Sequence, residues 1–356
     1  MHRGLSLYLD VVRFTAALFV FFFHAKDAKY NATWLEPVGW YGNDAVMIFF
    51  VLSGFVIAFV ANGREDTFDN YMVSRLARLW SVVIPALILT MVADTIGLQF
   101  DPEIYADGDY KGDNPVYRFV MNLFFLNEIW FISVQPFSNS PFWSMGYEFW
   151  YYVLFATWFY LSGWKRYVFT LVVAAIAGPK LLLLFPIWIM GAALFHYGGH
   201  IRLNKFMAWV LTLAPLAGYV LYREFDGHIL LSRFTYEVIG TAGISALRYS
   251  NIFLNHYVVG ALFSVHLLGM MTLAEGLSLP EPLERSIRWL AGMTFSLYLF
   301  HHPLLMMYAS LTKQGVAVVA LTLVTIMVLA PFTEGRKRQW RRWVEPLFRW
   351  AAPGKP

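Results

Sequence analysis

Ten apolar runs divide this 356-residue chain, and most approach the roughly 20 residues that an α-helix needs to cross a lipid bilayer. They fall near residues 5–25, 43–61, 76–97, 142–162, 167–178, 182–197, 206–222, 254–275, 289–309 and 315–333. The chain is 58% hydrophobic and only 14% charged, too apolar a composition for one soluble core to hide. We therefore expect an all-α polytopic integral membrane protein with about ten transmembrane helices.

The distribution of charge predicts the orientation of these helices. Basic residues cluster at 64–78, at 165–166 and at 336–349, whereas the loop 101–113 is acidic. Basic loops stay in the cytoplasm by the positive-inside rule, which ten spans with both termini cytoplasmic satisfy at every cluster. The apolar stretches 116–133 and 229–247 carry polar residues. Counting only one of them as a span would move the basic tail to the side of the membrane opposite the cytoplasm. We therefore expect neither to cross.

The same reasoning divides the chain into a membrane domain at 1–335 and a basic cytoplasmic tail at 336–356. The tail faces anionic headgroups of membrane lipid in this interpretation, and no nucleic acid is expected as a partner. The first apolar run lacks a small-residue cleavage site after it, so we expect a retained helix rather than a signal peptide. The chain has no cysteine, which excludes disulfides, thiolate metal sites and a cysteine nucleophile.

Ionisable residues interrupt the first apolar run. Arg13 and His24 are eleven residues apart, which on a helix leaves them about 20° apart in azimuth and therefore on one face. Charged groups in a spanning helix are costly unless paired, wet or functional. Two interpretations stay open: a functional groove, or a helix-positioning ion pair of Arg13 with Asp10 and an interfacial His24.

Further candidates lie in the third and fourth runs. Arg75 and Arg78, at i and i+3, present two guanidiniums on one face, which suits an anion with several phosphates or an ordinary cytoplasmic anchor. Glu148 lies among aromatic residues that include Trp143 and Tyr147. This cluster fits a platform for a sugar ring or an interfacial aromatic belt.

Tyr298, His301 and His302 lie near the outer end of the ninth run, and we expect them to contact substrate. Adjacent residues diverge by about 100° on a helix, so we expect at most one of the two histidines to face the groove. No metal-binding motif occurs, and we expect no metal. His256 and His266 are expected to be satisfied inside the bundle. Ser-Gly at 53–54 predicts close helix packing.

Together, five segments in this order resemble the membrane acyltransferase-3 family, which O-acylates bacterial surface and exported glycans. They are LDVVRFTAALFVFFFHA, FFVLSGFVIA, SRLARLW, FWSMGYEFWYY and FSLYLFHHPLL, and they extend over residues 9–305. The resemblance implies a ten-helix core, a cytoplasmic acyl-CoA donor, usually acetyl-CoA, and a sugar hydroxyl as acceptor. The family's arginine and histidine of the first helix map to Arg13 and His24, and its R-x-x-R arginines to Arg75 and Arg78. A basic residue before that element is missing here, where Ser74 stands.

The resulting hypothesis is a multi-pass O-acetyltransferase of the bacterial inner (plasma) membrane. It moves an acetyl or longer acyl group from acetyl-CoA to a hydroxyl of an exported polysaccharide or its lipid-linked repeat unit. His24 acts as general base, Arg13 stabilises the oxyanion, and Glu148 orients His24 or binds the acceptor. Some family members carry an extra C-terminal domain that completes the transfer. We expect no such domain here, so this chain should act alone or with a separate partner. The alternative is a proton-coupled secondary transporter, in which the same ionisable residues form a proton relay.

Overall fold

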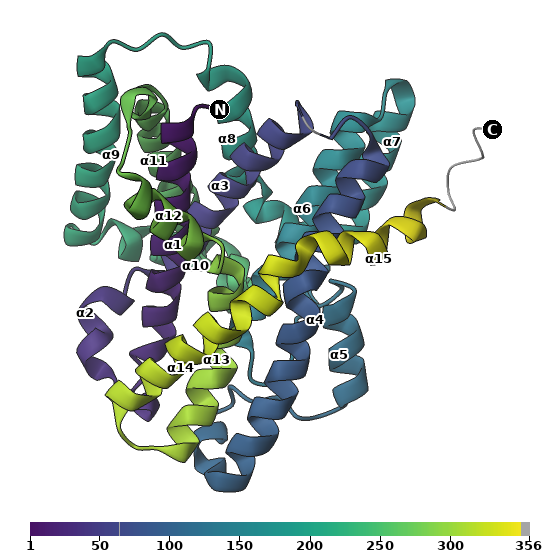
Figure 1. Cartoon of the computed structure of the whole chain (residues 1–356), viewed down its shortest axis with the longest axis vertical. Helices are drawn as coiled ribbons and strands as arrows, with labels where there is room; N and C mark the ends of the chain where they lie inside the picture. Colours follow the sequence, from purple (N-terminus) through teal and green to yellow (C-terminus); the bar gives the residue numbers. More distant parts are fainter. Residues whose placement is uncertain (64, 350–356) are drawn as a thin grey trace. The chain divides into compact units, whose positions relative to one another are not determined.

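Each of the ten apolar runs coincides with an α-helix in the computed structural model, which describes residues 1–63 and 65–349 (Figure 1). The helices are α1 (Arg3–Ala25), α2 (Glu36–Gly39), α3 (Gly42–Ala61), α4 (Phe68–Phe100), α5 (Pro115–Leu123), α6 (Trp143–Tyr160), α7 (Gly163–Ala177), α8 (Pro179–Gly198), α9 (Lys205–Glu224), α10 (Gly227–Leu247), α11 (Phe253–Leu273), α12 (Glu281–Ala291), α13 (Thr294–Leu311), α14 (Gly315–Leu329) and α15 (Lys337–Arg349). The described residues form no β-strand, which confirms the all-α class.

Seven helical segments among these residues are long and apolar enough to cross a membrane. They are α1, α3, α4, α8, α9, the stretch Gly227–Gly276 that contains α10 and α11, and Gly315–Phe348, which begins with α14. Helix α7 has only 15 residues, and polar and aromatic side chains lower the hydropathy of α6 and α13. The chain is therefore a polytopic membrane protein, and the count of ten spans stays a prediction.

The two stretches expected not to cross behave differently from the ten runs. Within 116–133 the only regular element is the end of α5, a helix of nine residues that is too short to span. The stretch 229–247 forms α10, which is kinked at Gly240, where φ is +66°. Asn255 in the first turn of α11 donates to Ser232 near the start of α10, over 2.7 Å. The start of α11 thus lies beside the start of α10, and the expectation that α10 does not cross the membrane stays a prediction.

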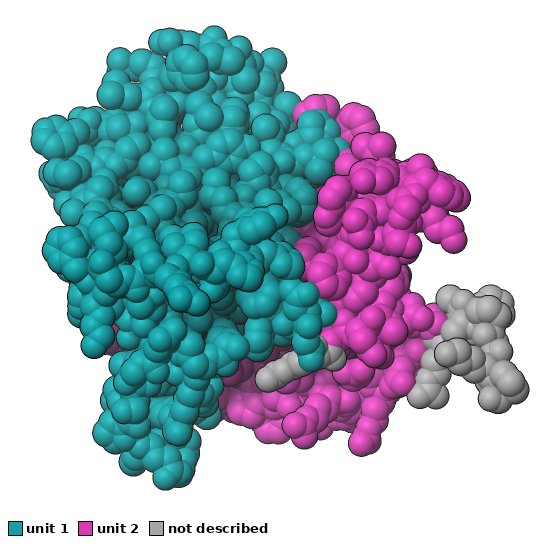
Figure 2. Space-filling model, turned by 90° about the horizontal axis from the view of Figure 1, so that it is seen from above, with its two compact units in different colours: residues 1–16, 44–64, 177–291 teal, residues 17–43, 65–176, 292–356 magenta. Residues whose placement is uncertain are grey.

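The chain forms two compact units, which Figure 2 colours separately. Unit 1 comprises residues 1–16, 44–64 and 177–291, and unit 2 comprises residues 17–43, 65–176 and 292–356. Helix α1 contributes its first part to unit 1 and its last part to unit 2.

Unit 1 contains a close crossing of α3 and α8. A Cβ atom added to Gly54 would clash with the carbonyl of Trp188, and one added to Gly191 would clash with the carbonyl of Val51. The indole of Trp188 also donates to Ser53 over 3.0 Å. The packing role predicted for the Ser-Gly pair is therefore confirmed, because only residues without bulk allow the two backbones to approach so closely.

Unit 2 collects its loops at two ends. At one end, Lys313 after α13 pairs with Asp101 after α4. At the other end, the phenol of Tyr160, the last residue of α6, donates to the Glu65 carbonyl over 2.7 Å. Arg341 of α15 also lies at this second end, 3.4 Å from Ser74 Oγ. The acidic loop and the basic segments thus lie at opposite ends of unit 2, as the charge distribution predicted.

Candidate active site

Three histidine rings meet in unit 2. His24 lies in the last turn of α1, and His301 and His302 lie within α13. The His24 ring centroid is 5.2 Å from that of His301 and 4.9 Å from that of His302. The expectation that only one of the pair would face the groove is not met: both contact His24. A ring from a second helix can lie between two side chains that diverge by about 100°.

The hydrogen bonds around this histidine cluster (His24, His301, His302) leave polar atoms without partners. His301 Nδ1 lies 2.9 Å from the Leu297 carbonyl, which assigns the proton to Nδ1 and a lone pair to Nε2. His301 Nε2 and His302 Nδ1 are buried and have no hydrogen-bond partner among residues 1–63 and 65–349. The same holds for the hydroxyl of Tyr30, whose ring lies 6.5 Å from that of His302. Because buried polar atoms are nearly always paired, these three atoms indicate a place for a polar ligand group.

An ion-pair group lies next to Tyr30 in the sequence. Lys29 Nζ is 2.5 Å from an Asp107 oxygen and 2.6 Å from an Asp109 oxygen. Burial acts to lower the pKa of Lys29, but its hydrogen bonds to the two carboxylates outweigh burial and raise that pKa. Partial burial acts to raise the pKa of Asp107, but the hydrogen bond from Lys29 prevails and lowers it. In this outer cap (Lys29, Asp107, Asp109), Lys29 and Asp107 therefore stay ionised across the physiological range.

The irregular segment between α5 and α6 is fixed to α4 and α13 by side chains. The Asp94 carboxylate accepts from the Ser138 backbone N–H over 3.0 Å and from its hydroxyl over 2.6 Å. Asn139 donates to Thr90 over 3.2 Å and to the Leu299 carbonyl over 2.8 Å. Non-helical backbone in a membrane protein needs such internal partners. The last of these bonds ties the segment to α13 two residues before His301.

The two arginines of α4 have different surroundings. Arg75 is only 6% exposed and pairs with Glu65 over 2.7 Å, while its guanidinium carbon lies 5.4 Å from the Tyr71 ring. Arg78 is less buried, and its guanidinium carbon lies 4.8 Å from the Phe295 ring. Over residues 1–63 and 65–349 no carboxylate forms an ion pair with Arg78. Of the two, Arg78 is therefore the guanidinium open to an external anion.

Helix α6 extends from the part of α13 that precedes the histidines to the part of α4 that carries Arg75 and Arg78. Near its start, Ser144 Oγ lies 2.7 Å from the hydroxyl of Tyr298. Further on, Tyr152 donates to the Glu148 carboxylate, and the guanidinium carbon of Arg75 lies 5.9 Å from the Tyr152 ring. Glu148 is one helical turn from both Ser144 and Tyr152, and so lies midway along this connection.

Trp143 and Tyr147 are packed inside unit 2. They are 8% and 0% exposed, and their rings meet edge to face with centroids 5.0 Å apart. A platform for a sugar ring requires a free aromatic face, whereas these two rings are packed against their neighbours. The stacking role of these two residues stays a prediction.

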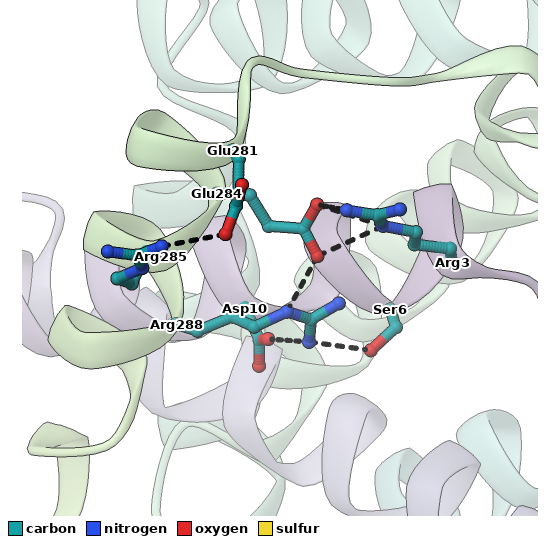
Figure 3. A network of polar contacts seen from close by, with 7 residues as sticks. All are labelled: Arg3, Ser6, Asp10, Glu281, Glu284, Arg285 and Arg288. Carbon is teal, nitrogen blue, oxygen red and sulfur yellow. Dashed lines mark hydrogen bonds and ion pairs between the residues drawn. The ribbon is translucent and has the colours of Figure 1, made fainter.

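Arg13 belongs to an ion-pair network in unit 1, which Figure 3 shows from Arg3 to Arg288. The Asp10–Arg13 pair expected from the sequence is present. Asp10 also accepts from Arg288 of α12 over 3.2 Å, and Glu284 of α12 pairs with Arg288 over 2.9 Å and with Arg3 over 2.5 Å (Figure 3). This α12 clasp (Arg3, Asp10, Glu284, Arg288) holds the helix that carries Arg13.

Sequence reasoning missed several polar residues that the structure brings into these groups. Asp94 interrupts the third apolar run, and the rule that singled out Glu148 applies to it equally. Lys29 and Asp107 are 78 residues apart and carry no local signal of their pairing. No cluster of three or more metal-ligating residues suited to a metal ion occurs in the described part of the chain.

Apolar helices of membrane-spanning length and a cluster of buried histidines define a polytopic membrane protein with a candidate catalytic centre. The acyltransferase-domain family model, that of acyltransferase-3, matches residues 6–333, and the chain belongs to that family. No curated protein and no solved structure matches the chain. The protein is thus a membrane acyltransferase that takes an acyl group from a donor to an acceptor.

Proposed function

We propose that the protein transfers an acetyl group from cytoplasmic acetyl-CoA to a sugar hydroxyl of an exported polysaccharide or its lipid-linked repeat unit. The observation that carries the proposal is the histidine cluster with its unpaired buried nitrogens. A hydroxyl acceptor needs a nearby neutral nitrogen to take its proton, and a reacting group there would satisfy atoms that are otherwise unpaired. The bacterial inner membrane is the compartment in which such a donor and acceptor meet.

His24 is the general base in this proposal. It removes the proton from the acceptor hydroxyl as that oxygen attacks the thioester carbon, which forms the new C–O bond. The tetrahedral intermediate then collapses with cleavage of the C–S bond. The protonated His24 returns its proton to the CoA thiolate, so that the ester and free CoA leave. His301 and His302 hold the acceptor or relay this proton, and Tyr298 fixes the segment beside them.

The donor enters from the other end of α4. Arg78 binds phosphate oxygens of CoA, and Arg75, held by Glu65, positions the surrounding helix rather than binding the donor itself. Glu148 lies between the arginines and α13 and contacts either substrate along that path. The oxyanion role expected for Arg13, which belongs to unit 1 and pairs with Asp10, stays a prediction.

The test is acetyl-CoA binding and turnover by purified protein, with wild type beside His24→Ala. Binding in both, with release of free CoA only by wild type, is the expected result. Near-normal turnover by His24→Ala refutes the general-base role. Absence of binding in both, with substrate uptake that depends on a proton gradient, replaces the proposal with the transporter alternative.

A further inference from the structure

Helix α15 lies against α4 in unit 2 and brings a second set of basic residues to the arginine end (Figure 1). Its sequence KRQWRRWVEPLFR places Val344 inward, at 2% exposure, and leaves its arginines at 341 and 342 exposed. The helix follows η8 (Glu334–Arg336), where the Glu334 carboxylate accepts from the backbone N–H groups of Phe295 and Ser296. The start of α15 is therefore held next to Phe295, the residue whose ring lies against the guanidinium of Arg78.

One contact fixes the register of α15 on α4. Arg341 Nη1 lies 3.4 Å from Ser74 Oγ. Ser74 precedes Arg78 by four residues, so both lie on one face of α4, one turn apart. Arg341 therefore reaches α4 one turn before Arg78, on the face that Arg78 shares, although 263 positions separate the two arginines in the sequence.

We propose that Arg341 completes the phosphate site of the donor, so that the guanidiniums of Arg78 and Arg341 together bind the phosphates of acyl-CoA. This inference rests on the proposed function and adds a residue to it. Coenzyme A carries a diphosphate and a separate 3′-phosphate, which a single guanidinium cannot serve. Arg341 hydrogen-bonds to the neutral hydroxyl of Ser74, and in the described residues neither Arg78 nor Arg341 has a carboxylate partner.

Anionic lipid headgroups offer the same phosphate chemistry to an exposed basic helix. The two sources differ in what a variant changes. A lipid contact at Arg341 alters the affinity of the protein for anionic bilayers and leaves acyl-CoA affinity alone. A donor contact changes acyl-CoA affinity even in a bilayer without net charge.

The experiment measures the dissociation constant of acetyl-CoA by calorimetry with full-length protein in phosphatidylcholine nanodiscs. Wild type, Arg341→Gln and the matched control Arg342→Gln, which removes the same charge one position along α15, are compared. Each is also titrated with 3′-dephospho-acetyl-CoA and repeated in phosphatidylglycerol nanodiscs.

We expect Arg341→Gln to weaken acetyl-CoA binding by about tenfold or more, as loss of a hydrogen bond to a charged group implies. Arg342→Gln should stay within about twofold of wild type. The double variant Ser74→Arg with Arg341→Gln should recover affinity, because a guanidinium at position 74 reaches the same place.

Unchanged acetyl-CoA affinity in Arg341→Gln overturns the inference while the proposed function stands. A loss that appears only in phosphatidylglycerol assigns Arg341 to lipid and overturns it as well. Failure of wild type to bind acetyl-CoA refutes the proposed function, and the inference with it.

Discussion

Arg75 and Arg78 are three residues apart on α4, yet the structure gives them different surroundings. Arg75 is buried in an ion pair with Glu65, whereas Arg78 lies on Phe295 with no carboxylate partner in the described residues. An R-x-x-R pattern alone treats the two arginines as equivalent. The difference between the two arginines depends on Glu65, which pairs with Arg75 and, in the described residues, not with Arg78. The backbone carbonyl of Glu65 accepts a hydrogen bond from Tyr160 of α6, which holds Glu65 in place.

Arg75→Gln should therefore destabilise the protein, and Arg78→Gln should impair donor binding. Removing one partner of a buried pair costs about 3–5 kcal/mol, because the remaining charge stays uncompensated. Loss of a phosphate contact at Arg78 should raise the acetyl-CoA dissociation constant about ten- to hundredfold. Thermal unfolding and calorimetry on both variants check this. Equal effects of the two variants on both measurements would contradict the assignment.

At the residue scale, local pairs were predictable and long-range groups were not. The Asp10–Arg13 pair follows from an i,i+3 spacing on one helix, and it is present. His266 is satisfied as expected, since its Nδ1 lies 2.8 Å from the Thr212 carbonyl. The same expectation is wrong for His256, both of whose ring nitrogens are buried without a partner. Nothing in a single sequence distinguishes these two histidines, because their partners come from other helices.

At the scale of elements, hydropathy located the apolar runs but not the amphipathic helices. The ten runs coincide with helices because bilayer-length apolar segments have one stable solution, the α-helix. Helix α12 is amphipathic, so its average hydropathy carries no signal, and its ion pairs to α1 are tertiary. The segment between α5 and α6 was equally hidden, because its backbone partners lie on α4 and α13.

The α12 clasp should support catalysis through Arg13. Arg288→Gln removes ion pairs to both Glu284 and Asp10, and we expect turnover to fall about tenfold, within the range that a misplaced catalytic group costs. The matched control is Arg285→Gln on the same helix, whose pair with Glu281 is 76% and 78% exposed. Exposed pairs contribute little, so this control should behave as wild type. The measurement is the turnover number of both variants at saturating acetyl-CoA. Equal losses in the two variants would contradict a catalytic role for the α12 clasp.

The outer cap should persist over a wide pH range. The pKa of Asp107 is held below its ordinary value of 3.8, so its contribution is complete above that pH and is lost as pH falls through the lowered pKa. The pKa of Lys29 is raised above 10.5, so its contribution is complete below that pH and is lost as pH rises through the raised pKa. Stability of wild type relative to Lys29→Met should therefore be constant between about pH 5 and pH 9. A difference that titrates near pH 7 would exclude this interpretation.

At the scale of the whole molecule, orientation is the property that the charge distribution predicts and that a label can test. The chain has no cysteine, so single substitutions give unique labelling sites without any background mutation. Lys111 lies in the acidic loop, Asp226 lies between α9 and α10, and Gln339 lies on α15, and all three side chains are exposed. Ten spans with cytoplasmic termini place the first two outside and the third inside.

Lys111→Cys and Asp226→Cys should therefore react with a membrane-impermeant maleimide added to intact spheroplasts, and Gln339→Cys should react only after the membrane is opened. Gln339 is the decisive position for α10, because an α10 that crossed the membrane would leave Asp226 outside and reverse every segment after it, including the tail. Labelling of Gln339→Cys in intact spheroplasts would place Arg78 and Arg341 away from the cytoplasm, where no acyl-CoA is available. This result would therefore refute both the predicted orientation and the proposed donor site.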